Sequence, residues 1–543
     1  MSPQKIYAEW IKANNVPNYI KNEIKKYSKS EIETYFKNEK LHFGTAGIRG
    51  IIGGGTNKMN IFTYMQMTVG YAKYLKKHFP KNTTVIIGHD NRILGEEFTY
   101  ACASVLTSFN IKVLLFKNNH LTPTPIVSYA IRKLKTDGGI IITASHNPKN
   151  YNGYKVYNPD GSQILPKVAN EIEKLMPTCE ELLTLSYTLK QNKLSFINEK
   201  IITSYLKDAQ KVIVNKKIIN VKKNYPVIIT THHGTASSYL PKFLKNLNFN
   251  INPVKEQCYP DCNFTNSPSS NPEFFDSFKK SIELANKKKA KILIGVDPDA
   301  DRMAVMIKHN NKWTLLTGNQ MGIIFTYYLL TNKKYINPYI ISSYVSTNYI
   351  DKIAKKYGVK IYRTGTGFKW MGNLITTKGD NNQLVVAFEE AIGALPTSIN
   401  RDKDSFTSSA LALEIDYICR KNNMDLLDYL EKVIFTKFGS WFGKTESFTI
   451  NDLNWKNIAK NKMRFFTNYK NENICDYQIK KIQFNKTGNC LEWLLSNDSW
   501  IKFRMSGTEP KFKIYYELNG DNLEKLQSDY NKMNKELSDL FYK

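Results

Sequence analysis

The stretch GGIIITASHNPKNYNGYKVY, residues 138–157, sets an apolar run directly against a cluster of polar residues. The run at 139–142 predicts a buried strand. Ser-His-Asn-Pro follows at 145–148, and Ser, Asn and Pro each favour turns for a different physical reason. One interpretation is therefore a plain turn, which this stretch alone favours. The other is a nucleophilic serine that a rigid scaffold presents on a loop.

Strand-like and helix-like segments alternate on both sides of this stretch. Such alternation predicts α/β units with largely parallel sheets. The strand patterns lie at 83–90, 111–117, 225–234, 291–297, 339–346, 359–364 and 383–390. From about Phe448 the pattern changes to strands joined by one loop at 493–520, followed by an amphipathic helix that runs to the C-terminus. This last part indicates a smaller α+β domain.

The chain has 543 residues. A single hydrophobic core does not extend over a chain of this length, so we expect three to five domains. We place four of them, three similar α/β domains and the C-terminal α+β domain. Their predicted bounds are 1–205, 206–320, 321–445 and 446–543.

Composition narrows the class of protein. No apolar run approaches the ~18 residues that a membrane helix needs, and residues 1–15 form an amphipathic helix pattern without a signal-peptide core. The seven Cys residues are irregularly spaced and form no paired metal-ligand pattern, which suits reduced thiols. We therefore expect a soluble, cytoplasmic protein with no membrane partner.

The formal charge of +29 raises the possibility of nucleic-acid binding. Only nine of the 77 basic residues are Arg, and the Lys residues are scattered over helical segments instead of forming one stripe. The densest run, at 286–291, fits the solvated end of a helix. We therefore predict no nucleic-acid partner. Four of the Arg residues lie in short turn-rich segments, where a planar guanidinium suits phosphate or carboxylate: Arg49, Arg302, Arg401 and Arg504.

Three carboxylates follow the apolar strand pattern at 291–297. Asp297, Asp299 and Asp301 occupy alternate positions, so they can turn toward one point at the strand end and hold a hard divalent cation. An EF-hand is excluded, because its sixth and twelfth positions would be Arg302 and Lys308 instead of Gly and Glu. The segment predicts a metal site, and Mg²⁺ completed by a phosphate oxygen fits it better than an acidic surface loop does.

Other polar loops follow other strand patterns. RMSGTEP at 504–510 is either a loop for a tetrahedral anion or an ordinary polar hairpin. GTGFK at 365–369 and the acid pair in FEEAIG at 388–393 are weak signals when taken alone. Ligands bind at strand ends in α/β folds, and a serine loop, a metal loop and an anion loop together indicate phosphoryl transfer.

Six motifs occur in the order and spacing of one known family. They are FGTAGIRG (43–50), TASHNPKNYNGYK (143–155), GVDPDADR (295–302), GTGFKWMGN (365–373), FEEAIG (388–393) and RMSGTEPKFKIYYE (504–517). From about Leu41 to Glu517 the chain resembles the α-D-phosphohexomutase superfamily. It is most similar to the type 2 phosphoglucomutase branch, which also includes phosphopentomutases and bacterial members labelled phosphomannomutase.

The resemblance implies a heart-shaped enzyme, with three α/β domains and a C-terminal α+β domain around a central cleft. It implies an intramolecular phosphotransferase that interconverts sugar 1-phosphate and 6-phosphate through a phosphoserine and a sugar 1,6-bisphosphate. The bisphosphate would be intermediate and activator, and one Mg²⁺ per chain the cofactor. Glucose or mannose phosphates are the expected partners, and a monomer or weak homodimer is the expected assembly.

The resemblance also implies roles for individual residues. Ser145 would be the phosphoserine, with Asp297, Asp299 and Asp301 holding Mg²⁺ beside it. Lys155 matches the family's acid/base, and Arg49 and His146 lie close to it. Adjacent residues rarely point at each other, so we expect Lys155 rather than His146 to transfer the proton. The sugar would contact Arg302, Gly365, Thr366, Lys369, Glu389 and Lys403, and the non-reacting phosphate would contact Arg504, Ser506, Gly507 and Thr508.

One departure leaves the substrate open. The family's acidic sugar-binding motif often reads Glu-x-Ser, whereas the third position here is Ala391. One contact to the sugar is therefore missing, so a phosphopentomutase acting on ribose or deoxyribose phosphates is an alternative. A catalytically silent nucleic-acid-binding protein on the same scaffold is a third hypothesis. It is disfavoured because Ser145, the three acids and Arg504 are all intact.

Overall fold

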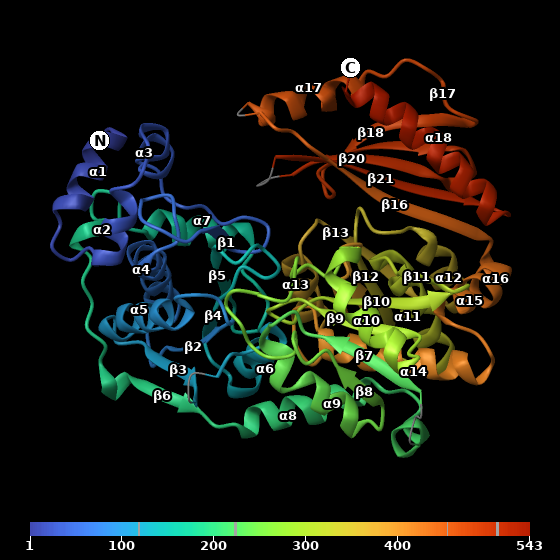
Figure 1. Ribbon diagram of the computed structural model, residues 1–543, viewed down its shortest axis with the longest axis horizontal. Helices are drawn as coiled ribbons and strands as arrows, with labels where there is room; N and C mark the ends of the chain where they lie inside the picture. The colour runs from blue at the N-terminus through green and yellow to red at the C-terminus, as the bar shows by residue number, and fades with distance from the viewer. Residues whose placement is uncertain (118–119, 222–224, 453, 507–509, 543) are drawn as a thin grey trace. The chain divides into compact units, whose positions relative to one another are not determined.

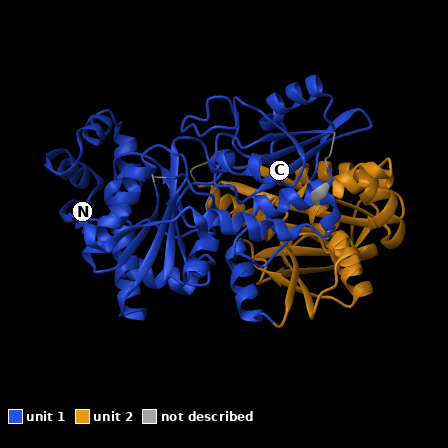
Figure 2. Cartoon of the chain, turned by 90° about the horizontal axis from the view of Figure 1, so that it is seen from below, with its two compact units in different colours: residues 1–316, 368–380, 393–414 blue, residues 317–367, 381–392, 415–543 orange. Residues whose placement is uncertain are grey.

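The computed structural model describes residues 1–117, 120–221, 225–452, 454–506 and 510–542. The chain divides into two compact units (Figure 2). Unit 1 comprises residues 1–316, 368–380 and 393–414, and unit 2 comprises residues 317–367, 381–392 and 415–543. Within the described residues no helix is both long and apolar enough to cross a lipid bilayer.

The first sheet of unit 1 has six strands and carries the Ser145 loop (Figure 1). Its order is β1 (Ile48–Ile51), β5 (Tyr151–Tyr157), β4 (Gly138–Ile142), β2 (Thr84–His89), β3 (Lys112–Phe116) and β6 (Leu194–Ile197). The pairs among β4, β2, β3 and β6 are parallel, as expected, but β5 pairs antiparallel with both β4 and β1. The eight residues between β4 and β5 are too few for the crossover that a parallel pair needs.

Helices cover both faces of this sheet. On one face, α4 (Ile61–His78), α5 (Gly95–Ser108) and α7 (Pro166–Leu175) share a hydrophobic core with Val85 and Ile87 of β2. On the other face lies α6 (Thr124–Leu134), so close that a Cβ on Gly88 would lie 2.7 Å from Val127. The N-terminal helices α1 (Pro3–Lys12), α2 (Asn18–Ile24) and α3 (Lys29–Tyr35) join the first core, where Trp10 and Phe36 are fully buried.

The second sheet of unit 1 has five strands and carries the Asp297–Asp301 loop. Its order is β11 (Lys312–Leu315), β10 (Met303–His309), β9 (Ile292–Val296), β7 (Pro226–Thr230) and β8 (Asn250–Pro253). The strands β8, β7 and β9 are parallel, and β10 runs back antiparallel to β9. Its helices are α9 (Leu240–Asn246) and α10 (Lys279–Lys288), and α8 (Lys200–Ala209) precedes it in the chain. In both sheets, therefore, the predicted functional loop connects an antiparallel pair at the end of a buried strand.

Two later segments belong to unit 1 although we placed them in a domain at 321–445. They contain α13 (Phe368–Lys378), β15 (Ala394–Leu395) and the first part of α14 (Ser405–Lys421). The amide of Arg401 donates to Ser128 Oγ of α6 (3.0 Å), and a Cβ on Gly372 would lie 2.2 Å from the Arg401 carbonyl. These segments therefore pack against residues of the predicted domain 1–205. The four domain bounds remain predictions.

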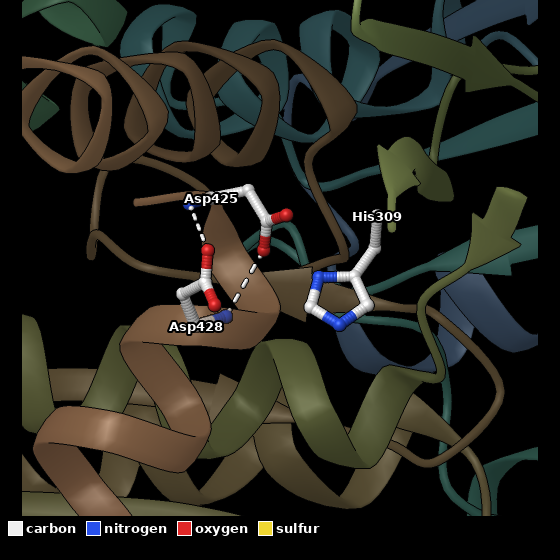
Figure 3. A group of neighbouring side chains, drawn as sticks. All are labelled: His309, Asp425 and Asp428. Atoms are coloured by element: carbon white, nitrogen blue, oxygen red, sulfur yellow. Dashed lines mark hydrogen bonds between the residues drawn. The ribbon is translucent and has the colours of Figure 1, made fainter. Parts of the chain in front are cut away.

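The first part of unit 2 has parallel strands in the order β13 (Lys360–Thr364), β12 (Pro338–Ser343) and β14 (Gln383–Phe388), with α11 (Gly318–Asn332) and α12 (Tyr349–Tyr357). A helical stretch follows at α15 (Leu426–Asp428), continues as a π-helix to Phe435, and ends in α16 (Thr436–Phe438). Figure 3 shows how it starts, with Asp425 and Asp428 each accepting the backbone N–H of the other at 3.0 Å. This reciprocal capping satisfies amides that the first helical turn leaves without partners.

The C-terminal part of unit 2 is a six-stranded antiparallel sheet, as the α+β prediction required. Its order is β16 (Ser440–Thr449), β21 (Lys511–Gly520), β20 (Trp500–Met505), β19 (Cys490–Leu495), β18 (Tyr477–Asn485) and β17 (Asn473–Ile474). The helices α17 (Trp455–Thr467) and α18 (Leu523–Tyr542) share one core with Ile501 and Phe503. Trp500 packs in a separate cluster with Val345, and Arg504 shares its face of β20 because side chains alternate along a strand.

Candidate active site

Ser145 occupies a strained position at the end of β4. Its φ is +54°, a left-handed conformation that is uncommon outside glycine. Its amide donates to Thr143 Oγ1 (2.8 Å), and its hydroxyl donates to Asp297 Oδ2 (2.8 Å). Ser145 is only 1% exposed. The turn predicted from Ser, Asn and Pro therefore turns the serine hydroxyl toward the carboxylate loop.

Arg92 fixes the backbone of this loop, a role that we did not predict. Its guanidinium donates to four carbonyl oxygens at 2.5–2.8 Å, those of Ser145, Asn147, Pro148 and Tyr151. Asp90 holds the guanidinium at 3.2 Å and also accepts from Thr143 Oγ1 at 2.6 Å. The signal was present in the sequence, because His-Asp-Asn-Arg at 89–92 ends strand β2 with polar residues just as the identified motifs end theirs.

The three carboxylates of the Asp297–Asp301 loop lie close together, as predicted. Oxygens of Asp297, Asp299 and Asp301 all lie within 4.8 Å of one another, and each residue is at most 2% exposed. Asp299 Oδ1 and Asp301 Oδ1 are buried and have no hydrogen-bond partner. A buried carboxylate oxygen without a partner is costly. Two such oxygens in an all-oxygen donor set fit a hard divalent cation.

Two lysines contact the second carboxylate oxygens of Asp299 and Asp301. Lys155 Nζ of β5 lies 2.7 Å from Asp299 Oδ2 and 3.3 Å from Asp301 Oδ2. Lys403 Nζ lies 3.2 Å from Asp301 Oδ2. We predicted Lys403 as a substrate contact, and the structure places its amine on a metal-loop carboxylate. Both lysines are in unit 1 with Ser145, so the charges of the triad are largely balanced within that unit.

Burial and neighbouring charges shift the titration of these groups in opposite directions. Burial, reinforced by Asp299 and Asp301, raises the pKa of Asp297 well above its usual value. Burial also acts to raise the pKa of Asp299, but Lys155 more than offsets it and holds that pKa below the usual value. Burial acts to lower the pKa of Lys155, yet Asp299 and Asp301 raise it overall. Lys155 is therefore held as a cation.

His146 and Arg49 also adjoin the serine loop. His146 Nδ1 lies 3.3 Å from Ser145 Oγ, so the expectation that these neighbours would not face each other is wrong. The left-handed turn at Ser145 brings the two side chains to one side. Burial and the cations around it, Arg302 first, lower the pKa of His146 well below its usual value, which keeps the imidazole neutral. Arg49 Nη1 donates to Asn147 Oδ1 (3.0 Å).

The predicted sugar contacts fall in both units. In unit 1, Arg302 Nη1 pairs with Glu273 (3.4 Å), and Lys369 Nζ donates to the Gly44 carbonyl (3.2 Å). In unit 2, Glu389 Oε1 accepts the amide of Gly367 at 2.7 Å, in the loop that contains Gly365 and Thr366. The structure thus brings Glu389 to the glycine loop. The sugar-binding roles of all these residues remain predictions.

The predicted phosphate loop is partly described. Arg504 pairs with Lys513 across strands β20 and β21, and the amide of Ser506 donates to the Lys511 carbonyl (2.9 Å). Burial and then Glu390 raise the pKa of Tyr515, while Arg504 opposes them, so Glu390 and Arg504 each lie near Tyr515. Gly507 and Thr508 lie outside the described residues. Strands β20 and β21, which flank this loop, form an antiparallel hairpin. An anion-binding role for the loop remains a prediction.

The chain matches a family of known proteins in three consecutive segments. Residues 40–182, 203–311 and 317–434 match the models described as phosphoglucomutase/phosphomannomutase, alpha/beta/alpha domains I, II and III. A phosphomannomutase of Mycoplasmoides pirum is 44% identical over 539 residues, 99% of each chain. A phosphoglucomutase of Staphylococcus aureus (strain MRSA252) is 32% identical over 517 residues, 91% of this chain and 92% of its own.

A solved structure has the same fold. The crystal structure of pp63/parafusin from Paramecium superposes with a TM-score of 0.65 at 19% identity, covering 90% of this chain and 92% of that one. At this identity the likeness concerns the fold alone. None of the three proteins named here is a phosphopentomutase, so the comparisons give no support to the pentose alternative.

Proposed function

The chain belongs to the phosphoglucomutase/phosphomannomutase family, and from that premise we propose that it interconverts hexose 1-phosphate and 6-phosphate through phosphorylated Ser145. The enzyme is a sugar-phosphate mutase. Glucose or mannose phosphate is the proposed substrate, and the sugar 1,6-bisphosphate is the proposed intermediate and activator. The observation that carries the proposal is the 2.8 Å contact between Ser145 Oγ and Asp297, beside two buried carboxylate oxygens without donors.

Mg²⁺ is the proposed cofactor, held by Asp297, Asp299 and Asp301 with an oxygen of phosphorylated Ser145. Mg²⁺ favours a few carboxylates completed by phosphate oxygens, which agrees with the donor set of this loop. When bound, the ion would neutralise charge on the transferring phosphoryl group. The protein's own cations act in the same sense, because Arg49 and Lys155 lie on the elements that flank Ser145.

Each transfer exchanges one P–O bond for another. When Ser145 Oγ attacks the bisphosphate, its bond to phosphorus forms, the bond from phosphorus to the sugar oxygen breaks, and one proton moves from the serine to that oxygen. We propose that neutral His146, 3.3 Å from Oγ, takes the serine proton and that Lys155 supplies one to the departing oxygen. The reverse transfer returns both protons, so the pair ends each cycle as it began.

We assign substrate recognition to groups in both units. Arg504, Ser506, Gly507 and Thr508 would hold the non-reacting phosphate through guanidinium, hydroxyl and backbone donors. Glu389 would accept sugar hydroxyls, with Gly365 and Thr366 beside it, and Arg302, Lys369 and Lys403 would contribute positive charge. A clamp that must accept either phosphate of a bisphosphate has to bind phosphate firmly and sugar loosely, which agrees with the absence of a hydroxyl at Ala391.

The test compares Ser145→Ala with Ser104→Ala, whose hydroxyl donates only to a carbonyl of its own helix. Each variant is assayed with glucose 1-phosphate, mannose 1-phosphate and ribose 1-phosphate, and the intact mass reports phosphorylation. We expect Ser145→Ala to lose at least about 10³-fold in turnover and to carry no phosphate, while Ser104→Ala retains both. Substantial mutase activity in Ser145→Ala would refute the phosphoserine assignment, and a faster reaction with ribose 1-phosphate would refute the hexose assignment.

A further inference from the structure

Asp402, which the proposed mechanism does not use, lies at the centre of a buried polar network. It is 1% exposed. Its Oδ2 accepts from the Tyr157 hydroxyl (2.8 Å) and from Gln163 Nε2 (2.8 Å). Its Oδ1 accepts the backbone amide of Lys403 (2.9 Å) and the Lys403 amine (3.1 Å). Four donors on one buried carboxylate fix its position.

The Lys403 amine lies between two carboxylates. It is 3.1 Å from Asp402 Oδ1 and 3.2 Å from Asp301 Oδ2. The same Asp301 oxygen also receives Lys155 Nζ at 3.3 Å, while Asp301 Oδ1 is buried, accepts no hydrogen bond and lies 3.8 Å from Arg302 Nε. One oxygen of Asp301 thus contacts both lysines, and the other keeps a lone pair for a metal ion.

From this arrangement we infer that Asp402 is a positioning residue that shares the Lys403 amine with Asp301 and so keeps Asp301 available to a divalent cation. The inference rests on the proposed metal site. Without the charge of Asp402, the Lys403 amine would lose a carboxylate partner, and a cation approaching the triad would meet an ammonium that Asp402 no longer neutralises. Charges interact strongly in such a buried environment.

Strand β5 links this network to the serine loop. Tyr157 holds Asp402, and Lys155 holds Asp299 and Asp301. The two residues are two positions apart on one strand, so their side chains leave the same face of the sheet. A single strand therefore sets both lysines around Asp301, one directly and the other through Asp402.

The mildest test removes one hydroxyl. Tyr157→Phe is compared with Tyr205→Phe, whose hydroxyl donates at 2.8 Å to Asp404, two residues along the same segment. Asp404 makes no ion pair with either lysine among those found in the described residues. Mn²⁺ affinity is measured by the electron paramagnetic resonance of the free ion. We expect Tyr157→Phe to weaken Mn²⁺ binding two- to fivefold and Tyr205→Phe to leave it unchanged. Equal affinities in the two variants would overturn the inference.

Charge-changing variants test the sharing directly. We expect Asp402→Asn to weaken Mn²⁺ binding about tenfold and Lys403→Met to tighten it, because the first removes a negative charge near the triad and the second removes a positive one. The double variant should return to within about threefold of the unsubstituted protein, since the two changes cancel. Weak binding in the double variant would show that Asp402 acts through the fold and not through Lys403, and would overturn the inference.

The Mn²⁺ titrations are repeated in a Ser145→Ala background, which keeps them independent of turnover. If Ser145 is not the phosphoserine, Ser145→Ala keeps its mutase activity while the ordering of the Mn²⁺ affinities persists. If Asp402 has no positioning role, Ser145→Ala is inactive as expected while the ordering of the Mn²⁺ affinities is lost. Unfolding curves without metal identify any variant that binds Mn²⁺ weakly because it is not folded. If Asp402→Asn is such a variant, the double variant and Tyr157→Phe decide the outcome.

Discussion

At the scale of single residues, the serine loop combines a strained backbone with an unusual density of hydrogen bonds. The left-handed conformation of Ser145 costs on the order of 1–2 kcal/mol, and it persists only where the surroundings compensate. Arg92 provides that compensation, because its planar fork reaches four carbonyls that no smaller cation could reach together. The loop geometry is therefore a property of Arg92 as much as of the loop's own residues.

Arg92→Lys tests this dependence. Lysine keeps the charge but has one nitrogen instead of a fork, so we expect two or more of the carbonyls to lose their donor. The free energy of unfolding should fall by about 2–4 kcal/mol, and kcat should fall at least about tenfold with a smaller change in KM. Urea unfolding and steady-state kinetics measure the two effects.

Arg132→Lys is the matched control, because Arg132, in the last turn of α6, donates to one carbonyl, that of Asp160 at 2.9 Å. It should be active and close to normal in stability. If Arg92→Lys kept full kcat, the serine loop would hold its shape without the fork, contrary to this interpretation.

His233 makes the stability of the fold sensitive to acid. Its Nδ1 faces the Tyr259 carbonyl at 3.2 Å and its Nε2 accepts the Asn266 amide at 3.1 Å, an arrangement that only the neutral ring satisfies. Burial lowers the pKa of His233, and burial likewise lowers that of His232. As the pH falls, the unfolded chain therefore takes up protons at these two histidines before the folded protein does. The neutral rings stabilise the fold fully above about pH 6.5. This stabilisation is lost as the pH falls through the lower pKa values of the folded protein.

We accordingly expect the free energy of unfolding to decrease between about pH 6.5 and 5, as measured by urea titration of the unphosphorylated protein. His233→Gln cannot titrate in this range and should show a shallower decrease, whatever its absolute stability. An unchanged slope in that variant would mean that His233 does not contribute to the acid sensitivity.

At the scale of elements, the sequence predicted the buried strands well and the returning strands poorly. Uncharged apolar runs such as Val85–Ile87 identify β2 whatever their surroundings, because a strand covered on both faces has little choice of residue. Strand β5 mixes Asn152, Gly153 and Lys155, which no local pattern separates from loop. It forms a strand because it pairs with β1 and β4 on either side. The local sequence pattern cannot predict this pairing.

Gly153 is the point at which this pairing is tightest. A Cβ there would lie 2.4 Å from the Thr143 carbonyl and 2.7 Å from the Ile48 carbonyl. Because Gly153 pairs with Arg49, Gly153→Ala should displace β1 and lower both stability and turnover. We expect a loss of about 2–4 kcal/mol and a fall in kcat of at least about tenfold, measured by chemical unfolding and by the mutase assay.

Gly358→Ala is the comparison, since φ there is +67° but nothing lies within 4 Å of the added Cβ. It should cost about 1 kcal/mol without lowering kcat. Equal kinetic effects in the two variants would indicate general destabilisation and not displacement of Arg49.

At the scale of the whole molecule, the motifs identified the loops that carry the chemistry, but not the residues that hold those loops in place. Ser145 and the three acids could be predicted because each lies at a strand end with a recognisable residue pattern. The contacts that join Asp402 to Tyr157 and Gln163 could not be predicted, because they form between residues far apart in the chain that meet in a buried network. The grouping of residues 393–414 with unit 1 has the same cause, since Arg401 contacts Ser128 of α6 and Asp402 contacts Tyr157 of the first sheet.

The open carboxylate oxygens also predict how a cation should affect the stability of the whole protein. A ligand that binds only the folded state stabilises it by about 2.7 kcal/mol when its concentration is a hundred times Kd. With Asp299 Oδ1 and Asp301 Oδ1 buried and without donors, Mg²⁺ or Mn²⁺ should therefore raise the melting temperature by about 3–6 °C. A chelator should reverse the rise.

Asp299→Asn removes one ligand charge and should abolish most of this shift. Asp351→Asn is the matched control, because Asp351 lies in unit 2 and is half exposed beside Arg363. The control should melt with the full shift. Scanning calorimetry also separates a cation effect on one transition from a general salt effect, since the latter would move every transition in both variants. If the cation shifted Asp299→Asn as much as the control, the buried triad would not be the site that stabilises the fold.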